Sequence, residues 1–110
     1  MTDDIFQSAM RSSGDVAGVF EYDGDVAYFY LYDLSKNKGQ QIKSAIHVMS
    51  GVPDFSDREV RISWNKSEDF VGLYIKRKLW AAFDIDGTKY GGGYSPTETP
   101  VLPDELLSRF

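Results

Sequence analysis

A chain of 110 residues is long enough to bury one core, and the absence of cysteine excludes a disulfide framework and a thiolate metal site. Aromatic residues make up 15% of the chain, with seven tyrosines and seven phenylalanines, which favours one β-rich domain over residues 1–110 rather than a helical bundle. The formal net charge of −5 argues against nucleic-acid binding, because neutralising phosphates requires an excess of lysine and arginine.

The first thirteen residues fit two structures. Thr2, Asp3 and Asp4 precede apolar residues at a spacing that suits a short capped helix ending at Gly14, although an extended edge strand would also fit. We expect helix or irregular structure here. This acidic start carries no signal-peptide features, and no stretch approaches 18 apolar residues, so we expect a cytoplasmic protein with no membrane partner.

A β-hairpin is the strongest local prediction. Two β-prone runs, 16–22 and 25–33, flank the turn-forming pair Asp23-Gly24. The second run alternates on both faces, because side chains of a strand point to opposite sides in turn. Ala27, Phe29 and Leu31 share one face, and Tyr28, Tyr30 and Tyr32 share the other.

The rest of the chain reads as further strands joined by polar turns. They are predicted at residues 41–49, 60–64, 71–76, 79–85 and 88–90. Strict alternation puts Leu79 and Phe83 inward and Trp80 outward, while three consecutive glycines at 91–93 end regular pairing. After a proline-containing segment, residues 103–110 predict one or two helical turns that could cover an open sheet face.

These elements predict a mainly β (α+β) fold. We expect an antiparallel meander of six or seven strands, strongly curled or barrel-like, with a short C-terminal helix. A twisted sheet with an apolar face must cover that face by curling or by a second layer.

No motif in the chain predicts catalysis, a metal site or a cofactor. Asp84-Ile85-Asp86-Gly87 resembles the start of a calcium loop but lacks its later acidic positions, so it predicts a turn. His47 is the only histidine, and Gly91-Gly92-Gly93 lacks the lysine and helix of a phosphate loop. We therefore expect a protein that is not an enzyme.

The aromatic face of the predicted sheet is the candidate site. Tyrosine and tryptophan dominate protein interfaces because they combine a large rigid area with a polar group, although a second buried layer would also explain them. The predicted partner contacts are Tyr28, Tyr30, Tyr32, Tyr74 and Trp80, with Asp23 and Asp25 at the rim. The basic run Lys76-Arg77-Lys78 is predicted to be a solvated turn between strands.

The segment from Phe20 to Tyr30 reads F-E-Y-D-G-D-V-A-Y-F-Y and resembles a block in a family of small uncharacterised bacterial proteins. Ile46-His47-Val48, a tryptophan-bearing hairpin and Ala81-Ala82-Phe83-Asp84 extend the resemblance over residues 16–86. The resemblance implies a bacterial origin and a compact β-rich domain of unknown function. It carries over no catalytic or ligand-binding residue.

The sequence favours a non-catalytic protein-interaction module, such as an immunity-like or antitoxin-like inhibitor, whose acidic charge suits a basic partner. Two alternatives remain at this point. A closed barrel could bind a small molecule among the same aromatics, or the tyrosine face could be a homodimer interface.

Overall fold

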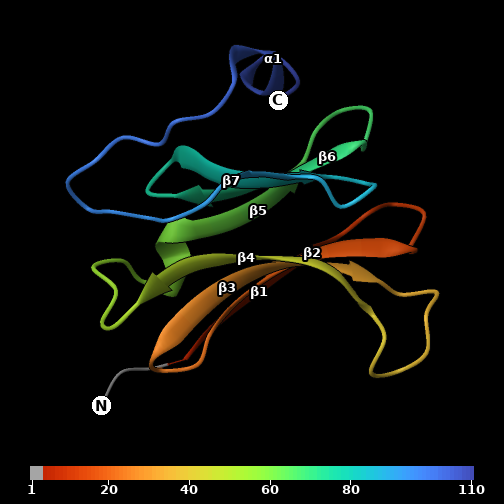
Figure 1. Cartoon of the computed structure of the whole chain (residues 1–110), viewed down its shortest axis with the longest axis horizontal. Helices are drawn as coiled ribbons and strands as arrows, with labels where there is room; N and C mark the ends of the chain where they lie inside the picture. The colour runs from red at the N-terminus through yellow and green to blue at the C-terminus, as the bar shows by residue number, and fades with distance from the viewer. Residues whose placement is uncertain (1–3) are drawn as a thin grey trace.

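The computed structural model describes residues 4–110 and consists of two four-stranded antiparallel sheets stacked face to face (Figure 1). Sheet A contains, in spatial order, β1 (Ile5–Met10), β2 (Val16–Tyr22), β3 (Val26–Asp33) and β4 (Ile42–Ser50). Sheet B contains β5 (Val60–Trp64), β6 (Phe70–Ile75), β7 (Lys78–Asp84) and β8 (Lys89–Gly91). The predictions of an antiparallel, mainly β fold and a short C-terminal helix are confirmed.

The predicted strand number and the predicted curled or barrel-like closure are wrong. The described residues form eight strands, and β4 and β5 lie in different sheets rather than side by side. Between them, residues 51–56 and the 3₁₀ turn η1 (Asp57–Glu59) carry the chain from one layer to the other. The apolar faces are therefore covered by stacking, as in a β-sandwich, and not by closure of one sheet.

The predicted Asp23-Gly24 hairpin is confirmed, and its turn has a clear cause. The Asp23 Oδ1 atom accepts hydrogen bonds from the backbone N–H groups of Asp25 (3.0 Å) and Val26 (2.9 Å). Gly24 adopts a φ of +98°, which L-residues rarely take. Both backbone hydrogen bonds lower the pKa of the Asp23 carboxyl group, and the bond from Val26 has the larger effect.

The core lies between the two sheets and follows the alternation of the strands. Phe29 of β3 and Phe83 of β7 meet across the interface with ring centroids 4.8 Å apart, and both are fully buried. Gly18 faces inward from β2, where an added Cβ would come within 2.8 Å of the Val71 side chain. A glycine at this point lets the sheets approach closely, which favours dense packing.

The N-terminal segment is a strand and not the expected helix or irregular structure. β1 pairs antiparallel with β2 from Ile5↔Tyr22 to Met10↔Ala17. Ile5 is buried in the core, whereas Phe6 and Met10 face outward and are 63% and 60% exposed. The proposed capping residues Thr2 and Asp3 lie outside the described residues.

Hydrogen bonds join the sheets along both edges of the sandwich. At one edge, the Trp64 Nε1–H group of β5 donates to the Ala9 carbonyl of β1 (3.0 Å). At the other edge, the chain leaves β8 through Gly91–Gly93, and the Tyr94 N–H group donates to the Val48 carbonyl of β4 (2.8 Å). Such ties reduce the tendency of edge strands to pair with other chains.

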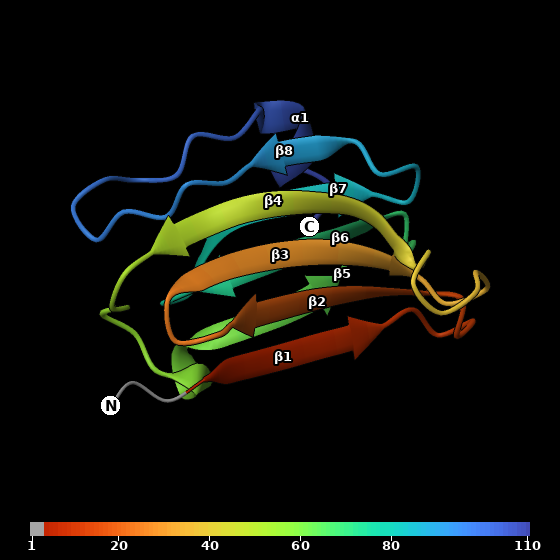
Figure 2. The ribbon, with the colours of Figure 1, turned by 60° about the horizontal axis from the view of Figure 1, so that its bottom comes forward.

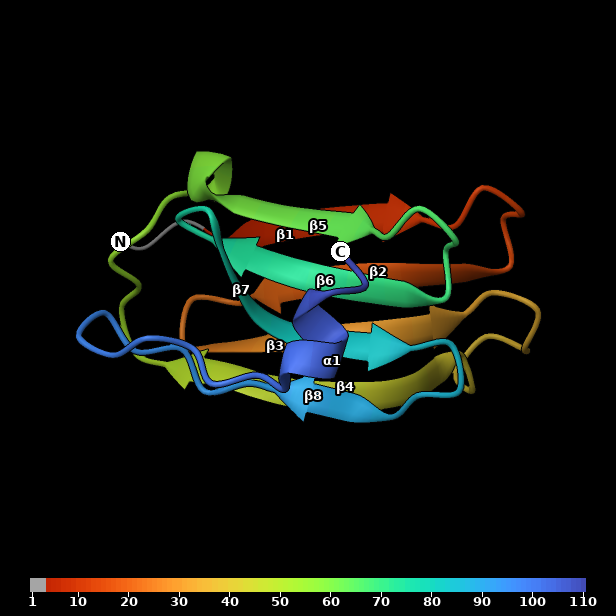
Figure 3. The ribbon, with the colours of Figure 1, turned by 90° about the horizontal axis from the view of Figure 1, so that it is seen from above.

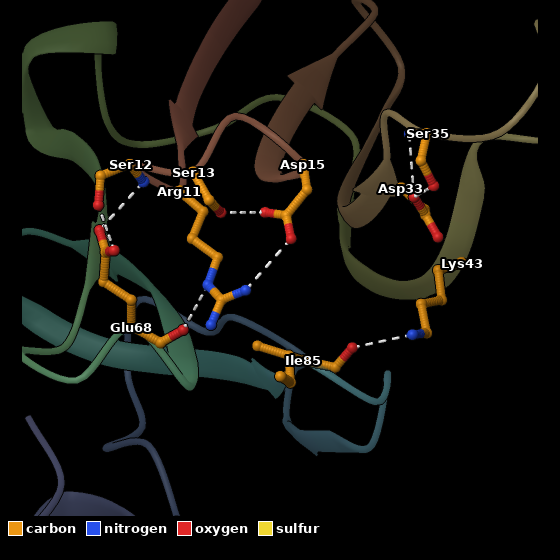
Figure 4. A network of polar contacts seen from close by, with 9 residues as sticks. All are labelled: Arg11, Ser12, Ser13, Asp15, Asp33, Ser35, Lys43, Glu68 and Ile85. Carbon is orange, nitrogen blue, oxygen red and sulfur yellow. Dashed lines mark hydrogen bonds and ion pairs between the residues drawn. The ribbon is translucent and has the colours of Figure 1, made fainter.

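A polar network fastens the β1–β2 turn to the β5–β6 turn (Figure 4). The Arg11 guanidinium donates through Nε to the Glu68 carbonyl (2.9 Å), and its Nη1 atom forms an ion pair with Asp15 (3.2 Å). The Glu68 carboxylate accepts hydrogen bonds from both the backbone N–H and the hydroxyl group of Ser12. Both hydrogen bonds lower the pKa of the Glu68 carboxyl group below its ordinary value of 4.5, and the bond from the hydroxyl group has the larger effect.

The lowered pKa of Glu68 predicts an acid-sensitive contribution to stability. A group whose pKa is lower in the folded than in the unfolded state stabilises the fold above its unfolded pKa, and this stabilisation is lost as the pH falls through the folded pKa. We therefore expect Glu68→Gln to lower the urea midpoint at pH 7 and to have a much smaller effect near pH 3. Glu98→Gln, which removes the same charge from the exposed C-terminal segment, is the control. An equal effect of Glu68→Gln at both pH values would contradict the expectation.

The C-terminal segment covers the outer face of sheet B and leaves that of sheet A open (Figures 1 and 3). Helix α1 (Asp104–Leu107) buries Leu106, and the Phe110 ring lies where a side chain on Gly72 would point. Leu107 remains 46% exposed. Within the described part of the chain, no helix is long and apolar enough to cross a membrane.

Candidate interaction surface on the outer face of sheet A

Three tyrosines of β3 form a row on the outer face of sheet A, which Figure 2 shows from its open side. The rings of Tyr28 and Tyr30 stack with centroids 5.7 Å apart and an interplanar angle of 19°. The ring of Tyr32 meets Tyr30 edge-on at 5.9 Å and 89°. We call these three residues the tyrosine platform. Their neighbours Ala27, Phe29 and Leu31 are fully buried, which confirms the predicted alternation of this strand.

Small and apolar side chains surround the platform on the adjacent strands. Val19 of β2 and Ala45 of β4 lie directly opposite Tyr30 in the sheet register. Although Val19 points outward, it is only 8% exposed. The exposed Phe6 and Met10 of β1 continue the apolar surface toward the edge of the sheet. Exposed apolar groups gathered on one face are typical of interaction surfaces.

Carboxylates lie on one side and at one end of the platform. Glu21 is exposed and lies opposite Tyr28 in the register of β2 and β3. Partial burial raises the pKa of the Tyr30 phenol, and the negative charge of Glu21 raises it further by a smaller amount. Asp23 and Asp25 are exposed in the turn between the same two strands. The two aspartates therefore lie in the turn at one end of the platform.

His47 also belongs to this face. Its ring meets the edge of Tyr28 with centroids 5.3 Å apart, and its Nε2 atom lies 3.0 Å from the Ser50 hydroxyl oxygen. The residue is exposed, and it lies on the same face of sheet A as its register partner Tyr28.

The expectation that Tyr74 and Trp80 share the face of the tyrosine platform is wrong. Tyr74 lies on the outer face of sheet B, where its ring packs against Phe110 at 6.2 Å and beneath the Arg61 guanidinium at 4.9 Å. Trp80 is 5% exposed, belongs to the core and contacts the Tyr94 ring at 4.8 Å. A register shift after Leu73 makes Trp80 an extra residue of β7, so the strict alternation fails there.

The calcium-loop fragment is a turn, as predicted. The Asp84 Oδ1 atom accepts hydrogen bonds from the N–H groups of Asp86 (2.9 Å) and Thr88 (3.0 Å), and Gly87 adopts a φ of +93°. Within residues 4–110, no group of three or more histidine, aspartate or glutamate side chains is placed to hold a metal ion.

A second surface feature was missed by the sequence reasoning. Arg58, Glu59, Arg61, Tyr74, Lys76 and Arg77 line an open hollow of about 850 Å³ at the η1 end of sheet B. Only the run that begins at Lys76 is visible as a local cluster in the sequence. Arg58 belongs to η1 and Arg61 to β5, and both side chains reach the same hollow through folding.

Comparison with known proteins identifies the family but gives no characterised relative. No curated protein and no solved structure matches the chain. Residues 2–106 match a family described as "Uncharacterized protein conserved in bacteria (DUF2251)". This match agrees with the resemblance seen in the block from Phe20 to Tyr30 and extends it to nearly the whole chain. The chain therefore belongs to the DUF2251 family of bacterial proteins.

Proposed function

We propose that this protein is a non-catalytic protein-interaction module that binds a basic protein through the tyrosine platform, in the manner of an immunity or antitoxin-like inhibitor. The observation that carries the proposal is the open row of Tyr28, Tyr30 and Tyr32 on sheet A, with exposed apolar residues beside it. Tyrosines in such a position gain contact area at little conformational cost, because two χ angles fix each ring.

The chemistry of the partner follows from the charges around the platform. Glu21, Asp23 and Asp25 give the face a negative side and end, and the whole chain has a formal net charge of −5. Arginine and lysine side chains can pair with these carboxylates and can lie over tyrosine rings. A negative field also speeds the approach of a basic protein, so binding is expected to weaken with salt.

The stacked-sheet architecture does not favour the barrel alternative. Over residues 4–110 the apolar faces of the two sheets pack directly on each other through Phe29 and Phe83, and no barrel is formed. These stacked sheets therefore have no barrel interior in which the aromatics could enclose a ligand. In a homodimer, the tyrosine platform would instead contact a second copy of this chain. The experiment below distinguishes this alternative from binding of a different protein.

The test compares baits that differ only at the two stacked rings. We expect the wild-type bait to capture a protein of basic isoelectric point from a lysate of a bacterium that encodes the chain. Tyr28→Ala combined with Tyr30→Ala should weaken binding of the purified partner in a calorimetric titration by about 30-fold or more, because each ring is a candidate hot spot. The variant should keep the far-ultraviolet circular dichroism spectrum of the wild type, since both rings lie outside the core.

Tyr74→Ala is the matched control, because it removes a tyrosine from the other sheet and should leave partner binding unchanged. Equal binding by the wild type and the double variant, capture of no protein by the wild type, or an acidic partner would each count against the proposal. A doubled mass in light scattering that the double variant abolishes would assign the platform to a second copy of this chain instead.

A further inference from the structure

We infer that the hollow at the η1 end of sheet B is a binding site for a small molecule that carries phosphate groups. Its lining contains four cationic side chains and a single carboxylate: Arg58, Arg61, Lys76, Arg77 and Glu59. This concentration of positive charge occurs in a chain of net charge −5. The inference does not depend on the proposed function, because the hollow and the tyrosine platform lie on different sheets.

Three of the four cations are available to a ligand. Within residues 4–110, Arg58, Arg61 and Arg77 form no ion pair, although all three are exposed beside the hollow. The one carboxylate of the lining is partly engaged, because Glu59 Oε1 accepts the Ser56 N–H at 3.0 Å. Guanidinium groups present paired N–H donors that match the oxygens of phosphate, so an arginine cluster favours such a ligand.

Two cations of the hollow are held in position by their neighbours. The Arg61 guanidinium lies over the Tyr74 ring, 4.9 Å from its centroid. Stacking uses the face of the guanidinium and leaves its in-plane N–H donors free. The Lys76 Nζ atom donates to Asp54 at 3.0 Å, and Asp54 in turn accepts the Tyr94 hydroxyl at 2.7 Å. Such pre-organisation lowers the entropic cost of binding.

The turn between β6 and β7 has a backbone that does not suit its residues. Lys76 and Arg77 have φ angles of +52° and +71° in a two-residue turn that pairs Ile75 with Lys78. Asparagine and glycine are favoured at both positions, because L-residues with longer side chains are strained there. The turn thus places two cations at the hollow, although their positive φ angles lower the stability of the turn. Strained backbone of this kind is frequent at functional sites.

The hollow also suits a small molecule in size. Its volume of about 850 Å³ lies within the range of pockets that hold small ligands. Tyr74 supplies an aromatic wall, so a ligand with a planar organic part could contact the ring while its phosphates face the arginines. Tyr74 and Phe110 already meet edge-on, which keeps this wall in place.

The experiment titrates the full chain with tripolyphosphate, ATP and a pentaglutamate peptide, using calorimetry and backbone amide NMR shifts. We expect tripolyphosphate and ATP to bind at millimolar or lower concentrations and to shift the amides of residues 58–61 and 74–77. If ATP binds more tightly than tripolyphosphate, the ligand belongs to the nucleotides. If the two bind equally tightly, the site recognises the phosphate chain alone. Binding of pentaglutamate alone would overturn the inference in favour of an acidic protein segment.

Three variants separate the effect of charge from that of folding. Arg58→Gln, Arg61→Gln and Arg77→Gln together should weaken tripolyphosphate binding at least about tenfold, whereas Lys36→Gln, Lys38→Gln and Lys66→Gln remove three exposed cations elsewhere and should change it little. Lys76→Asn with Arg77→Gly should raise the melting temperature by about 5 °C, because it relieves the turn, and should still weaken binding. Absence of binding by the wild type, or equal binding by the arginine and control variants, would overturn the inference.

Discussion

Replacing Trp80 by alanine is expected to lower the free energy of unfolding by about 3–5 kcal/mol. The side chain is 5% exposed, and it packs in the core against the Tyr94 ring at 4.8 Å. Its removal leaves a large cavity that the surrounding strands can fill only in part. Chemical denaturation in urea, followed by tryptophan fluorescence of Trp64 and by circular dichroism, measures the change.

Two substitutions serve as controls for Trp80→Ala. Trp80→Phe keeps an aromatic ring at the same place and should cost less. Tyr28→Ala removes a half-buried ring from the outer face of sheet A and should cost about 1 kcal/mol, the usual size for a partly exposed position. If Trp80→Ala and Tyr28→Ala proved equally mild, Trp80 would not be a core residue. A binding defect of Trp80→Ala would reflect loss of folding, so this variant cannot test an interaction surface.

Trp80 also shows why strict alternation misassigned part of sheet B. The sequence places Trp80 with Ala82 on the outer face and Leu79 on the inner face. In the structure, Leu73 pairs with Ala81 and Tyr74 pairs with Leu79, so one residue of β7 has no partner. A β-bulge of this kind moves the residues before it to the opposite face of the sheet from the one that strict alternation predicts. No local pattern in the sequence indicates where such a bulge occurs.

The first strand was missed for a different reason. Ile5, Phe6, Ala9 and Met10 are apolar at spacings that suit a helix. In the folded chain, the outer face of sheet A is itself apolar at Phe6 and Met10, so the usual contrast between inner and outer residues is absent from β1. When the outer face of a strand is apolar, the alternation of apolar and polar residues that identifies a strand is lost. The same apolar outer face indicates an interaction surface.

Local signals predicted the hairpins, whereas the stacking of the sheets depends on contacts that are distant in sequence. The Asp23-Gly24 and Asp86-Gly87 turns were recognised because their glycines supply the positive φ that such turns require. The carboxylates of Asp23 and Asp84 accept the backbone hydrogen bonds of these two turns. Nothing in the alternation of β4 and β5 states whether they pair or lie in different layers. The tyrosine platform was predicted because it lies on one strand, and the arginine hollow was missed because its residues come from η1, β5 and the β6–β7 turn.

Gly91→Ala is expected to destabilise the fold more than Gly93→Ala, although both glycines have similar positive φ angles of +71° and +64°. The two substitutions share a backbone penalty of about 1–2 kcal/mol, since L-residues are disfavoured in this region. At Gly91, however, an added Cβ would lie 2.4 Å from the Trp80 carbonyl oxygen, whereas nothing lies within 4 Å at Gly93. The steric overlap involves backbone and cannot be relieved by a side-chain rotation.

The expected difference between these two variants is about 1–3 kcal/mol, the usual cost of overpacking, and urea denaturation of both proteins measures it. The segment they probe carries the chain from β8 to the edge of β4, where Gly92 donates to the Trp80 carbonyl and Tyr94 donates to that of Val48. A large loss for Gly91→Ala would therefore show that β8 is held closely against the Trp80 backbone of β7. Equal losses for the two variants would mean that β8 can shift away from the Trp80 backbone to accommodate the added Cβ, and the close approach at Gly91 would then contribute little to stability.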